Sequence, residues 1–365
     1  MLADHSFSGE YRMATKKAVT IKDIAKKVNV SVATVGNALS GAPNVSEKTR
    51  EQILKVAGEM GYSTNYHARA LGKKGIKIAL LFPEEPVEFT TLIVRGMEER
   101  VDEIRDYGID FQKYFFHDNM AADEASDCVR AIRDEHVDGI LYGADFAAQS
   151  YIDRLAEYVQ KEHVPVFRMD RGQDVVPGIG EVHSDSEAMG RLAAEFIHMF
   201  YGKKAHVGVI STNLGHANHV YLLDSFKQDC EKYGIDVKKI LFNDDSKAKT
   251  YAATKTLLQK YPDINLIYVT SYDSVSACRC IENMKMQHQV KVLSHDIHRG
   301  MLPYLEKEMI VASIYQNPKL QGRIAIDRMV SYLLGNRDFP RSNPVRPELV
   351  LRSNVSCYLE ANDCG

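Results

Sequence analysis

From Ile78 onward the sequence alternates short, continuously apolar runs with longer stretches of helical periodicity. The nine apolar runs are Ile78–Phe82, Phe111–Phe116, Gly139–Tyr142, Val164–Met169, His206–Ser211, Lys239–Phe242, Leu266–Thr270, Val290–Ser294 and Val311–Tyr315. A strand that is apolar on both faces must be covered on both faces, so the alternation predicts a parallel, doubly wound α/β sheet. Nine such runs over about 240 residues are more strands than a single sheet usually contains. We therefore expect two doubly wound lobes with a ligand cleft between them, at the carboxyl ends of the strands.

A different pattern precedes this α/β body. Residues 20–61 predict three short helices, with Thr20, Ser31 and Ser46 in position to cap their N-termini. The first two helices are joined by a tight turn at Asn29-Val30, which makes them a helix-turn-helix candidate. We therefore expect a small all-α head in front of the α/β body.

The net charge of −3 conceals an asymmetry between head and body. Residues 15–74 carry eleven Lys or Arg and four Asp or Glu, a net of +7, whereas the chain from residue 75 onward carries −9. A small basic head on an acidic body is typical of a module that binds a polyanion such as nucleic acid. A basic face that is merely solvated would have the same composition, so charge alone leaves both interpretations open.

Composition also excludes several classes of protein. No stretch reaches the ~18 consecutive apolar residues of a membrane span, and the N-terminal residues lack the apolar core of a secretion signal. The six cysteines are scattered and form no C-x-x-C pair, which indicates reduced thiols in a cytoplasmic protein. We therefore expect a cytoplasmic, nucleoid-associated protein without a membrane partner.

Specific strings of residues resemble a known family. The string Thr20-Ile-Lys-Asp-Ile-Ala-Lys-Lys-Val-Asn-Val-Ser31-Val-Ala-Thr-Val is similar to the opening of the lactose-repressor-type regulators, the LacI/GalR family. The strings Val45-Ser-Glu-Lys-Thr-Arg50 and Gly61-Tyr-Ser-Thr-Asn65-Tyr-His-Ala-Arg-Ala-Leu71 continue the match in register. In the body, Val182-His-Ser-Asp-Ser-Glu-Ala-Met-Gly190 and Ala312-Ser-Ile-Tyr-Gln316-Asn-Pro-Lys-Leu-Gln-Gly322 extend it. The resemblance implies a DNA-binding head on a body like the type I periplasmic sugar-binding proteins.

This resemblance and the composition predict one domain order. The expected parts are an unstructured leader (1–14), a helix-turn-helix DNA-binding domain (15–61), a linker with a hinge helix (62–76) and a two-lobed effector-binding and dimerisation domain (77–365). The first lobe is expected at about 77–182 and 315–345, and the second at about 183–314 and 346–365. The chain should then cross between lobes near Glu181–Asp185, Val311–Asn317 and Asn343–Glu348.

By this resemblance the second helix of the head enters the major groove of DNA. The residues expected to read bases are Val32, Ala33, Gly36 and Asn37, and those expected to face the DNA backbone are Thr20, Ser31 and Thr34. Asn37 can pair bidentately with an adenine edge, whereas Val32 and Ala33 offer apolar contact, most simply to a thymine methyl. Gly36 departs from the serine that is usual in the family. The alternatives are that Asn37 is an exposed residue with no DNA role and that the hydroxyls are simple helix caps.

The linker carries a second family signal. By the resemblance, Asn65 caps a hinge helix, Ala68 allows close helix approach in a dimer, and Leu71 wedges into a central base step from the minor groove. Thr64 stands where the family usually has proline, which predicts weaker ordering of this helix. A passive linker is the alternative interpretation.

The family's effector positions fall mainly at predicted strand ends. The expected effector-binding residues are Phe89, Asp170, Arg171, His219, Tyr272, Asp296 and Gln316. Planar polar groups and aromatic faces of this kind suit a carbohydrate-like ligand, although each polar residue alone could be a loop or hinge hydrogen-bonder. Two positions depart from the family: Leu222 replaces a pocket arginine and Tyr272 replaces a frequent asparagine. The spacing of His216 with His219 and of His295 with His298 would suit a metal, but no acidic or cysteine cluster supports one, so we expect no metal and no cofactor.

These observations predict a ligand-responsive transcriptional regulator, expected to be a repressor of carbohydrate-related genes. It would act as a homodimer on a pseudo-palindromic operator, with a small-molecule effector and no catalytic residues. The competing interpretations are a sugar-binding protein and an α/β sugar enzyme with an incidental basic head. No nucleotide-binding, nucleophile-elbow or zinc-protease motif supports the enzyme. The sequence leaves open the operator, the effector, repression or activation, induction or corepression, and dimer or tetramer.

Overall fold

The chain divides into two compact units, each with its own hydrophobic core. The first unit comprises residues 1–73 and 334–337, and the second comprises residues 74–333 and 338–365. The computed structural model describes residues 21–39, 45–59, 75–83, 88–116, 122–143, 149–169, 171, 176–212 and 217–363. No helix among these residues is long and apolar enough to cross a membrane.

The first unit contains the three expected helices, α1 (Ile21–Val28), α2 (Val32–Leu39) and α3 (Glu47–Glu59). Ile24, Val35 and Ile53, one from each helix, are fully buried and form the centre of its core. The turn between α1 and α2 depends on Asn29, whose φ of +58° lies in the left-handed region that asparagine tolerates better than most residues. The amide of Val30 then donates to the carbonyl of Ala25 (3.1 Å) and closes the end of α1.

Hydroxyl caps begin the other two helices of this unit. Ser31 Oγ accepts a hydrogen bond from the amide of Thr34 (3.0 Å), and Ser46 Oγ accepts one from the amide of Thr49 (3.3 Å). The guanidinium of Arg50 donates to the carbonyl of Ala38 (3.2 Å), which ties α3 to the last turn of α2. These bonds fix the orientation of α2 within the head.

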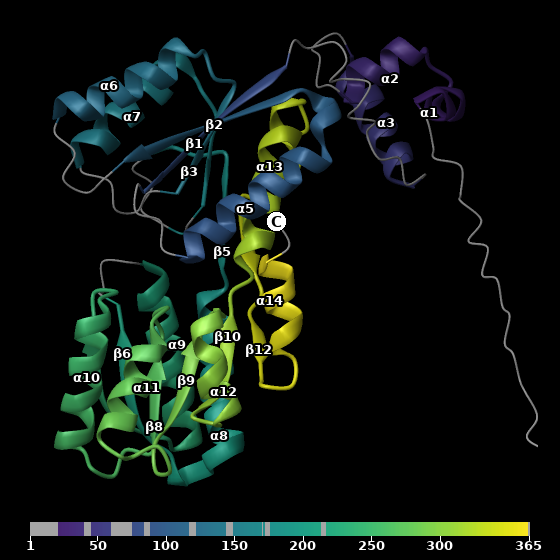
Figure 1. The fold of residues 1–365 in the computed structure, drawn as a ribbon. Helices are drawn as coiled ribbons and strands as arrows, with labels where there is room; N and C mark the ends of the chain where they lie inside the picture. Colours follow the sequence, from purple (N-terminus) through teal and green to yellow (C-terminus); the bar gives the residue numbers. More distant parts are fainter. Residues whose placement is uncertain are drawn as a thin grey trace, which may run out of the picture. The chain divides into compact units, whose positions relative to one another are not determined.

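The second unit contains two six-stranded sheets (Figure 1). The strands of the first sheet, in spatial order, are β11 (Ser342–Val345), β5 (Gly180–Ser184), β4 (Val166–Arg168), β3 (Gly139–Tyr142), β1 (Ile76–Pro83) and β2 (Ile109–Phe116). All neighbouring pairs in this sheet are parallel. One face is covered by α6 (Ala122–Asp134) and α7 (Gln149–Glu162), and α5 (Glu88–Glu103) and α13 (Pro318–Leu333) pack tightly together in the same lobe. The short helix η1 (Arg105–Tyr107) follows α5.

The second sheet repeats this construction. Its strands, in spatial order, are β12 (Glu348–Val350), β10 (Ile310–Tyr315), β9 (Lys291–His295), β8 (Leu266–Val269), β6 (His206–Ser211) and β7 (Asp236–Phe242). Only β12, among the described strands, runs antiparallel to its neighbour.

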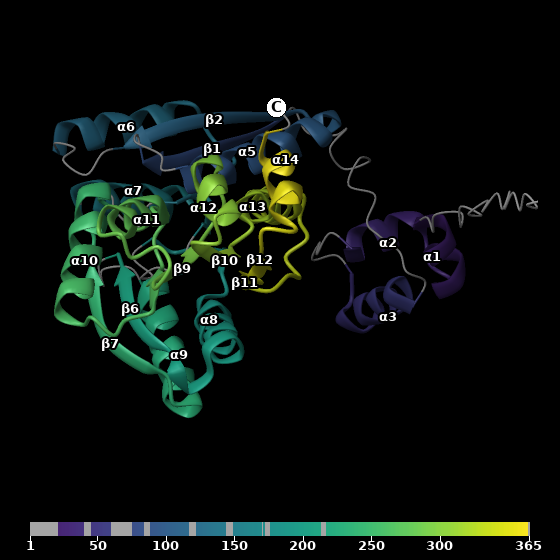
Figure 2. The same cartoon turned by 60° about the horizontal axis from the view of Figure 1, so that its bottom comes forward.

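Helices cover both faces of the second sheet (Figure 2). One face carries α8 (Ser186–Tyr201) and α9 (Ala217–Tyr233). The other carries α10 (Lys247–Lys260), α11 (Ser274–Asn283), α12 (Leu302–Glu306) and α14 (Val355–Asp363). Two further short helices are η2 (Gly202–Lys204) and η3 (Arg299–Met301).

Strand order shows where the chain passes from one sheet to the other. It leaves the first sheet after β5, returns after β10 to form α13, and leaves again between β11 and β12. Neither α/β lobe is therefore a single continuous segment.

The fold class predicted from the sequence is confirmed: a helical head and two parallel-sheet α/β lobes. Each of the nine apolar runs forms a strand. The strands β5, β11 and β12 were not predicted.

Candidate DNA-binding and effector sites

The helix α2 buries one side in the head and leaves the other side open. Val35 and Ala38 are almost completely buried, whereas Val32 is 47% exposed. Ala33 is also exposed, and a Cβ added at Gly36 would meet no atom within 4 Å. Asn37 is half-buried on the same helix. The four residues predicted to read bases therefore lie away from the core of the head.

Ser31 and Thr34 lie together at the N-terminus of α2. Their hydroxyl oxygens are 2.7 Å apart, and Ser31 also caps the helix. Hydroxyls at a helix N-terminus are groups that can bind a phosphate oxygen. Five lysines of the described head are exposed, which gives it the positive charge that DNA binding requires: Lys22, Lys26, Lys27, Lys48 and Lys55. The predicted contacts at Thr20, Asn65, Ala68 and Leu71 lie outside the described residues.

Asp296, at the carboxyl end of β9, is the most deeply buried of the predicted effector residues that the structure describes. Its carboxylate accepts hydrogen bonds from Gln316 Nε2 (2.7 Å) and more weakly from the Gln316 amide (3.4 Å). Burial raises the pKa of Asp296 to about 7, against the smaller opposing effect of these bonds. Its φ of +56° lies in the left-handed region, a conformation that costs free energy and is common at functional sites.

Gln316 connects Asp296 to the first sheet. Its carbonyl accepts a hydrogen bond from Gln321 Nε2 (2.9 Å), and the same nitrogen donates to Ser184 Oγ (3.0 Å). Asp296 follows β9, Gln316 follows β10, and Ser184 ends β5. Hydrogen bonds therefore join residues at two of the places where the chain passes between the sheets.

His219 lies beside the ends of β6 and β8. Its Nδ1 is 3.5 Å from Thr270 Oγ1, which donates to Ser211 Oγ (2.8 Å). Burial lowers the pKa of His295 to about 3, and the nearby His219 contributes, so the His295 ring is neutral. His295 Nε2 shares a hydrogen bond with the hydroxyl of Tyr268 (2.7 Å). The structure thus places His219 at the same end of the second sheet as Asp296.

Asp273 and Ser274 add polar atoms at the end of β8. Asp273 Oδ1 caps α11 by accepting from the amide of Ser276 (3.2 Å). Its Oδ2 and the hydroxyl of Ser274 are buried, and neither has a hydrogen-bond partner among the described residues. The adjacent Tyr272 stacks its ring on that of His298, with centroids 4.6 Å apart. Buried polar groups without partners cost free energy unless a ligand or water satisfies them.

Arg171 follows β4 of the first sheet and contacts two helices of the second lobe. Its guanidinium donates to Glu187 Oε1 (2.8 Å) in the first turn of α8 and lies 4.2 Å from the ring centroid of Tyr221 on α9. The hydrogen bond that Arg171 donates to Glu187 raises the pKa of Arg171. Phe89 is half-buried in the first turn of α5, and Asp170 lies outside the described residues.

Leu222 stands at the position where the family has a pocket arginine, and here this position belongs to the core. It is 2% exposed and packs in the core between α8, α9 and the second sheet. Its carbonyl lies against Gly190, where an added Cβ would be 2.3 Å away. The position therefore contributes to packing and offers no charged group to a ligand.

One cluster among the described residues has the composition of a metal site: His206, Asp236 and Asp263. Lys238 Nζ lies 2.5 Å from a carboxylate oxygen of each aspartate, so an ammonium group already neutralises them. His206 begins β6, at the opposite end of the strand from Ser211. The cluster is explained as an ion-pair network away from the strand ends discussed above.

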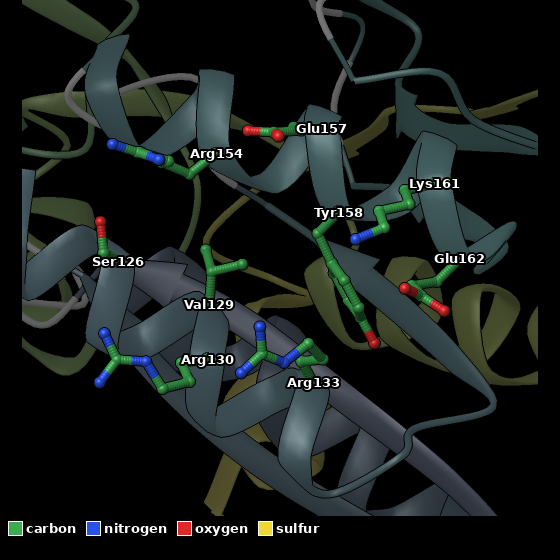
Figure 3. Close-up of a pocket in the computed structure, with 9 residues that line it drawn as sticks. All are labelled: Ser126, Val129, Arg130, Arg133, Arg154, Glu157, Tyr158, Lys161 and Glu162. Atoms are coloured by element: carbon green, nitrogen blue, oxygen red, sulfur yellow. The ribbon is translucent and has the colours of Figure 1, made fainter.

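A groove of about 250 Å³ lies between α6 and α7 of the first lobe (Figure 3). Its lining residues are Ser126, Val129, Arg130, Arg133, Arg154, Glu157, Tyr158, Lys161 and Glu162. Arg130 pairs with Asp127 (3.0 Å) and Arg133 with Asp134 (3.1 Å), so acids just outside the groove balance part of its positive charge. None of the predicted effector residues lines it.

Sequence reasoning did not find Glu187 and Tyr221. They are 16 and 50 positions from Arg171 in the sequence, and each lies on a different helix, so no local pattern links them to Arg171. Ser274 was also missed, although it directly follows an Asp at the end of a predicted strand, where ligand-binding residues are expected.

Two family models match the chain. Residues 20–65 match the model for bacterial regulatory proteins of the lacI family, and residues 78–337 match the periplasmic binding protein domain. The chain belongs to the lacI family of transcriptional regulators, with a helix-turn-helix DNA-binding domain and a periplasmic binding protein domain.

Individual relatives agree with this assignment. The transcriptional regulator DegA of Bacillus subtilis is 25% identical over 61% of this chain, and the match spans 64% of DegA. The repressor PurR of Photobacterium profundum is 22% identical over 92% of this chain and 98% of PurR. GanP, a glucose-galactose binding protein from Geobacillus stearothermophilus, has the same fold over 78% of this chain and 99% of GanP (TM-score 0.67, 20% identity). These relatives are regulators or binding proteins, which agrees with the absence of an enzyme motif.

Proposed function

We propose that this protein is a dimeric, effector-controlled repressor that binds a pseudo-palindromic operator. The observation that carries the proposal is the exposed side of α2, where Val32, Ala33, Gly36 and Asn37 lie opposite a well-packed core. One recognition helix reads only a few base pairs, so two-fold pairing is needed to reach useful specificity. Operator binding puts its site of action in the cytoplasm, at the nucleoid.

The hinge belongs to the same proposal. Asn65, Ala68 and Leu71 would form a short helix on the operator, and Leu71 would enter the minor groove between base pairs. The four-part division into leader, head, linker and two-lobed body, at the boundaries expected from the sequence, is proposed with it.

A small carbohydrate-type molecule would bind at the strand ends, in a cleft between the lobes. Phe89, Asp170, Arg171, His219, Tyr272, Asp296 and Gln316 are the residues proposed to bind it. The contacts of Arg171, and the series of hydrogen bonds that runs from Asp296 through Gln316 to Ser184, each join one lobe to the other. A ligand that changes these contacts would therefore change the arrangement of the lobes. An effector shifts DNA affinity only through such a difference between two states, and the coupling is reciprocal.

The proposal can be tested by operator selection with the full chain, followed by footprinting and sedimentation of the complex. We expect a two-fold-related footprint and two chains for each site. A monomer bound to a half-site at physiological salt would contradict the dimer. A protein that binds no DNA sequence selectively but turns over sugars would instead support an enzyme.

Arg171→Ala provides a second test, on the effector side. We expect it to abolish the ligand response and to leave operator affinity without ligand within about 1 kcal/mol, because Arg171 belongs to the body and no DNA contact is assigned to it. Lys161→Ala, in the groove between α6 and α7, is the matched control and should keep the full response.

A further inference from the structure

The segments that follow the parallel strands are acidic when they are taken together. Between the carboxyl end of each parallel strand and the next helix or strand, the sequence contains eleven Asp or Glu and two Arg, a net of −9. This equals the net charge of the entire chain from residue 75 onward, so the rest of the body is electrically balanced. The acidity of the body is therefore concentrated where α/β sheets bind ligands.

Two of these carboxylates are buried without a cation. Asp296 is 5% exposed and Asp273 is 9% exposed. Among the described residues, the carboxylate of Asp296 accepts hydrogen bonds from Gln316 alone, and Asp273 Oδ2 has no partner. A buried carboxylate is costly unless it is paired, so both sites favour a ligand that brings positive charge.

Neither Arg171 nor the position of the family's pocket arginine offers a free cation to Asp296 and Asp273. Arg171 donates to Glu187 and stacks on Tyr221. Leu222, at the position of the family's pocket arginine, is in the core. A phosphate or carboxylate on the effector would meet a surplus of negative charge at these strand ends.

We propose that the effector carries an ammonium group, as an amino sugar does, and that the carboxylates of Asp296 and Asp273 select it. This inference rests on the proposed function, which puts the effector at these strand ends. The protonated amine would donate charge-assisted hydrogen bonds to a carboxylate, and its hydroxyls would use the remaining polar groups. β8 and β9 are neighbouring parallel strands, so the segments that carry Asp273 and Asp296 begin at the same edge of one sheet.

The test compares matched sugars on the full chain by calorimetry. D-Glucosamine, D-galactosamine and D-mannosamine are each compared with the neutral parent sugar and with its 6-phosphate. At least one amino sugar should bind about tenfold more tightly than its neutral parent, because one charge-assisted hydrogen bond replaces a neutral one. The phosphate should bind more weakly than either.

Two isosteric variants then locate the selectivity. Asp296→Asn and Asp273→Asn should each lower affinity for the amino sugar about tenfold and reduce its advantage over the neutral sugar. Asparagine still caps a helix, so Asp273→Asn should keep α11 intact. Asp127→Asn, which removes an exposed carboxylate on α6, should bind like the wild type.

Equal or tighter binding of a neutral or phosphorylated sugar would overturn the inference, and so would the absence of binding by all three amino sugars at millimolar concentration. Unchanged selectivity in both variants would do the same. Each of these results leaves the proposed function standing if the protein still binds an operator selectively. Loss of selective operator binding in the wild type would instead refute the proposed function.

Discussion

Replacing Asp296 by asparagine should make the protein more stable at alkaline pH and leave its stability at acidic pH almost unchanged. Burial raises the pKa of Asp296 from 3.8 to about 7 in the folded protein. A folded-state pKa above the unfolded one favours folding with the proton bound, so this contribution is complete below about pH 4 and is lost as pH rises through about 7. Three pH units at 1.36 kcal/mol each correspond to about 4 kcal/mol. The side chain is 5% exposed, so solvent screening reduces this figure little.

The measurement is the difference in unfolding free energy between Asp296→Asn and the wild type, taken by urea denaturation from about pH 4 to about pH 8. Asparagine can still accept the short bond from Gln316 Nε2, so the difference should begin near zero and grow with pH. Asp127→Asn, with its side chain 67% exposed, should show no such growth. A difference that stays flat across this range would refute the reasoning, because it would mean that Asp296 ionises in the folded protein as easily as in the unfolded chain.

The remaining predictions concern DNA recognition and packing. Asn37→Ala should weaken operator binding by roughly 1–3 kcal/mol and relax the preference at one base pair in each half-site. Competition with operators altered at single base pairs measures both effects. An equal loss of affinity for every sequence would mean that Asn37 positions the helix on DNA and does not read a base. Leu71→Ala should weaken operator binding and leave its salt dependence nearly unchanged, because phosphate contacts set the salt slope; a salt titration that shows a changed slope with intact specificity would contradict the wedge. Gly190→Ala should destabilise the second lobe by about 3 kcal/mol, since its Cβ would lie 2.1 Å from Ser225 Oγ and 2.3 Å from the Leu222 carbonyl; a variant that melts like the wild type would show that α8 and α9 can separate at little cost.

The strands that the sequence predicted are those whose own composition determines their burial. The residues of β3 and β8 are buried throughout, and a strand that is buried on both faces has a continuous apolar sequence. The missed strands lie at or beside a sheet edge. β11 contains a proline and alternates exposed with buried residues, and β12 pairs with β10 alone. β11 and β12 pair with strands far away in the sequence, and these partners decide their structure.

The candidate sites divide in the same way. The exposed side of α2 follows from helical periodicity over eight residues, so it could be read locally. The resemblance, rather than any pattern, identified Asp296 and Gln316. The partners of Arg171 could not be predicted, because the Glu187 and Tyr221 contacts arise only when two helices and a strand end are brought together. The burial that raises the pKa of Asp296 likewise depends on long-range packing.

The passage of the chain between the sheets has a consequence for biosynthesis. The first lobe contains β1 to β5 near the amino end, yet its edge strand β11 and its helix α13 are encoded more than 130 residues after β5. Gly96 on α5 and Gly322 on α13 show how tightly that late helix fits, since an added Cβ at either would meet backbone at about 2 Å. During synthesis the first sheet therefore remains incomplete, and the apolar face of α5 remains uncovered, until α13 has been made. By then the ribosome has produced every strand of the second sheet except β12. Mutations that slow this stage should lower the yield of folded protein in cells more than they lower the stability of the finished molecule.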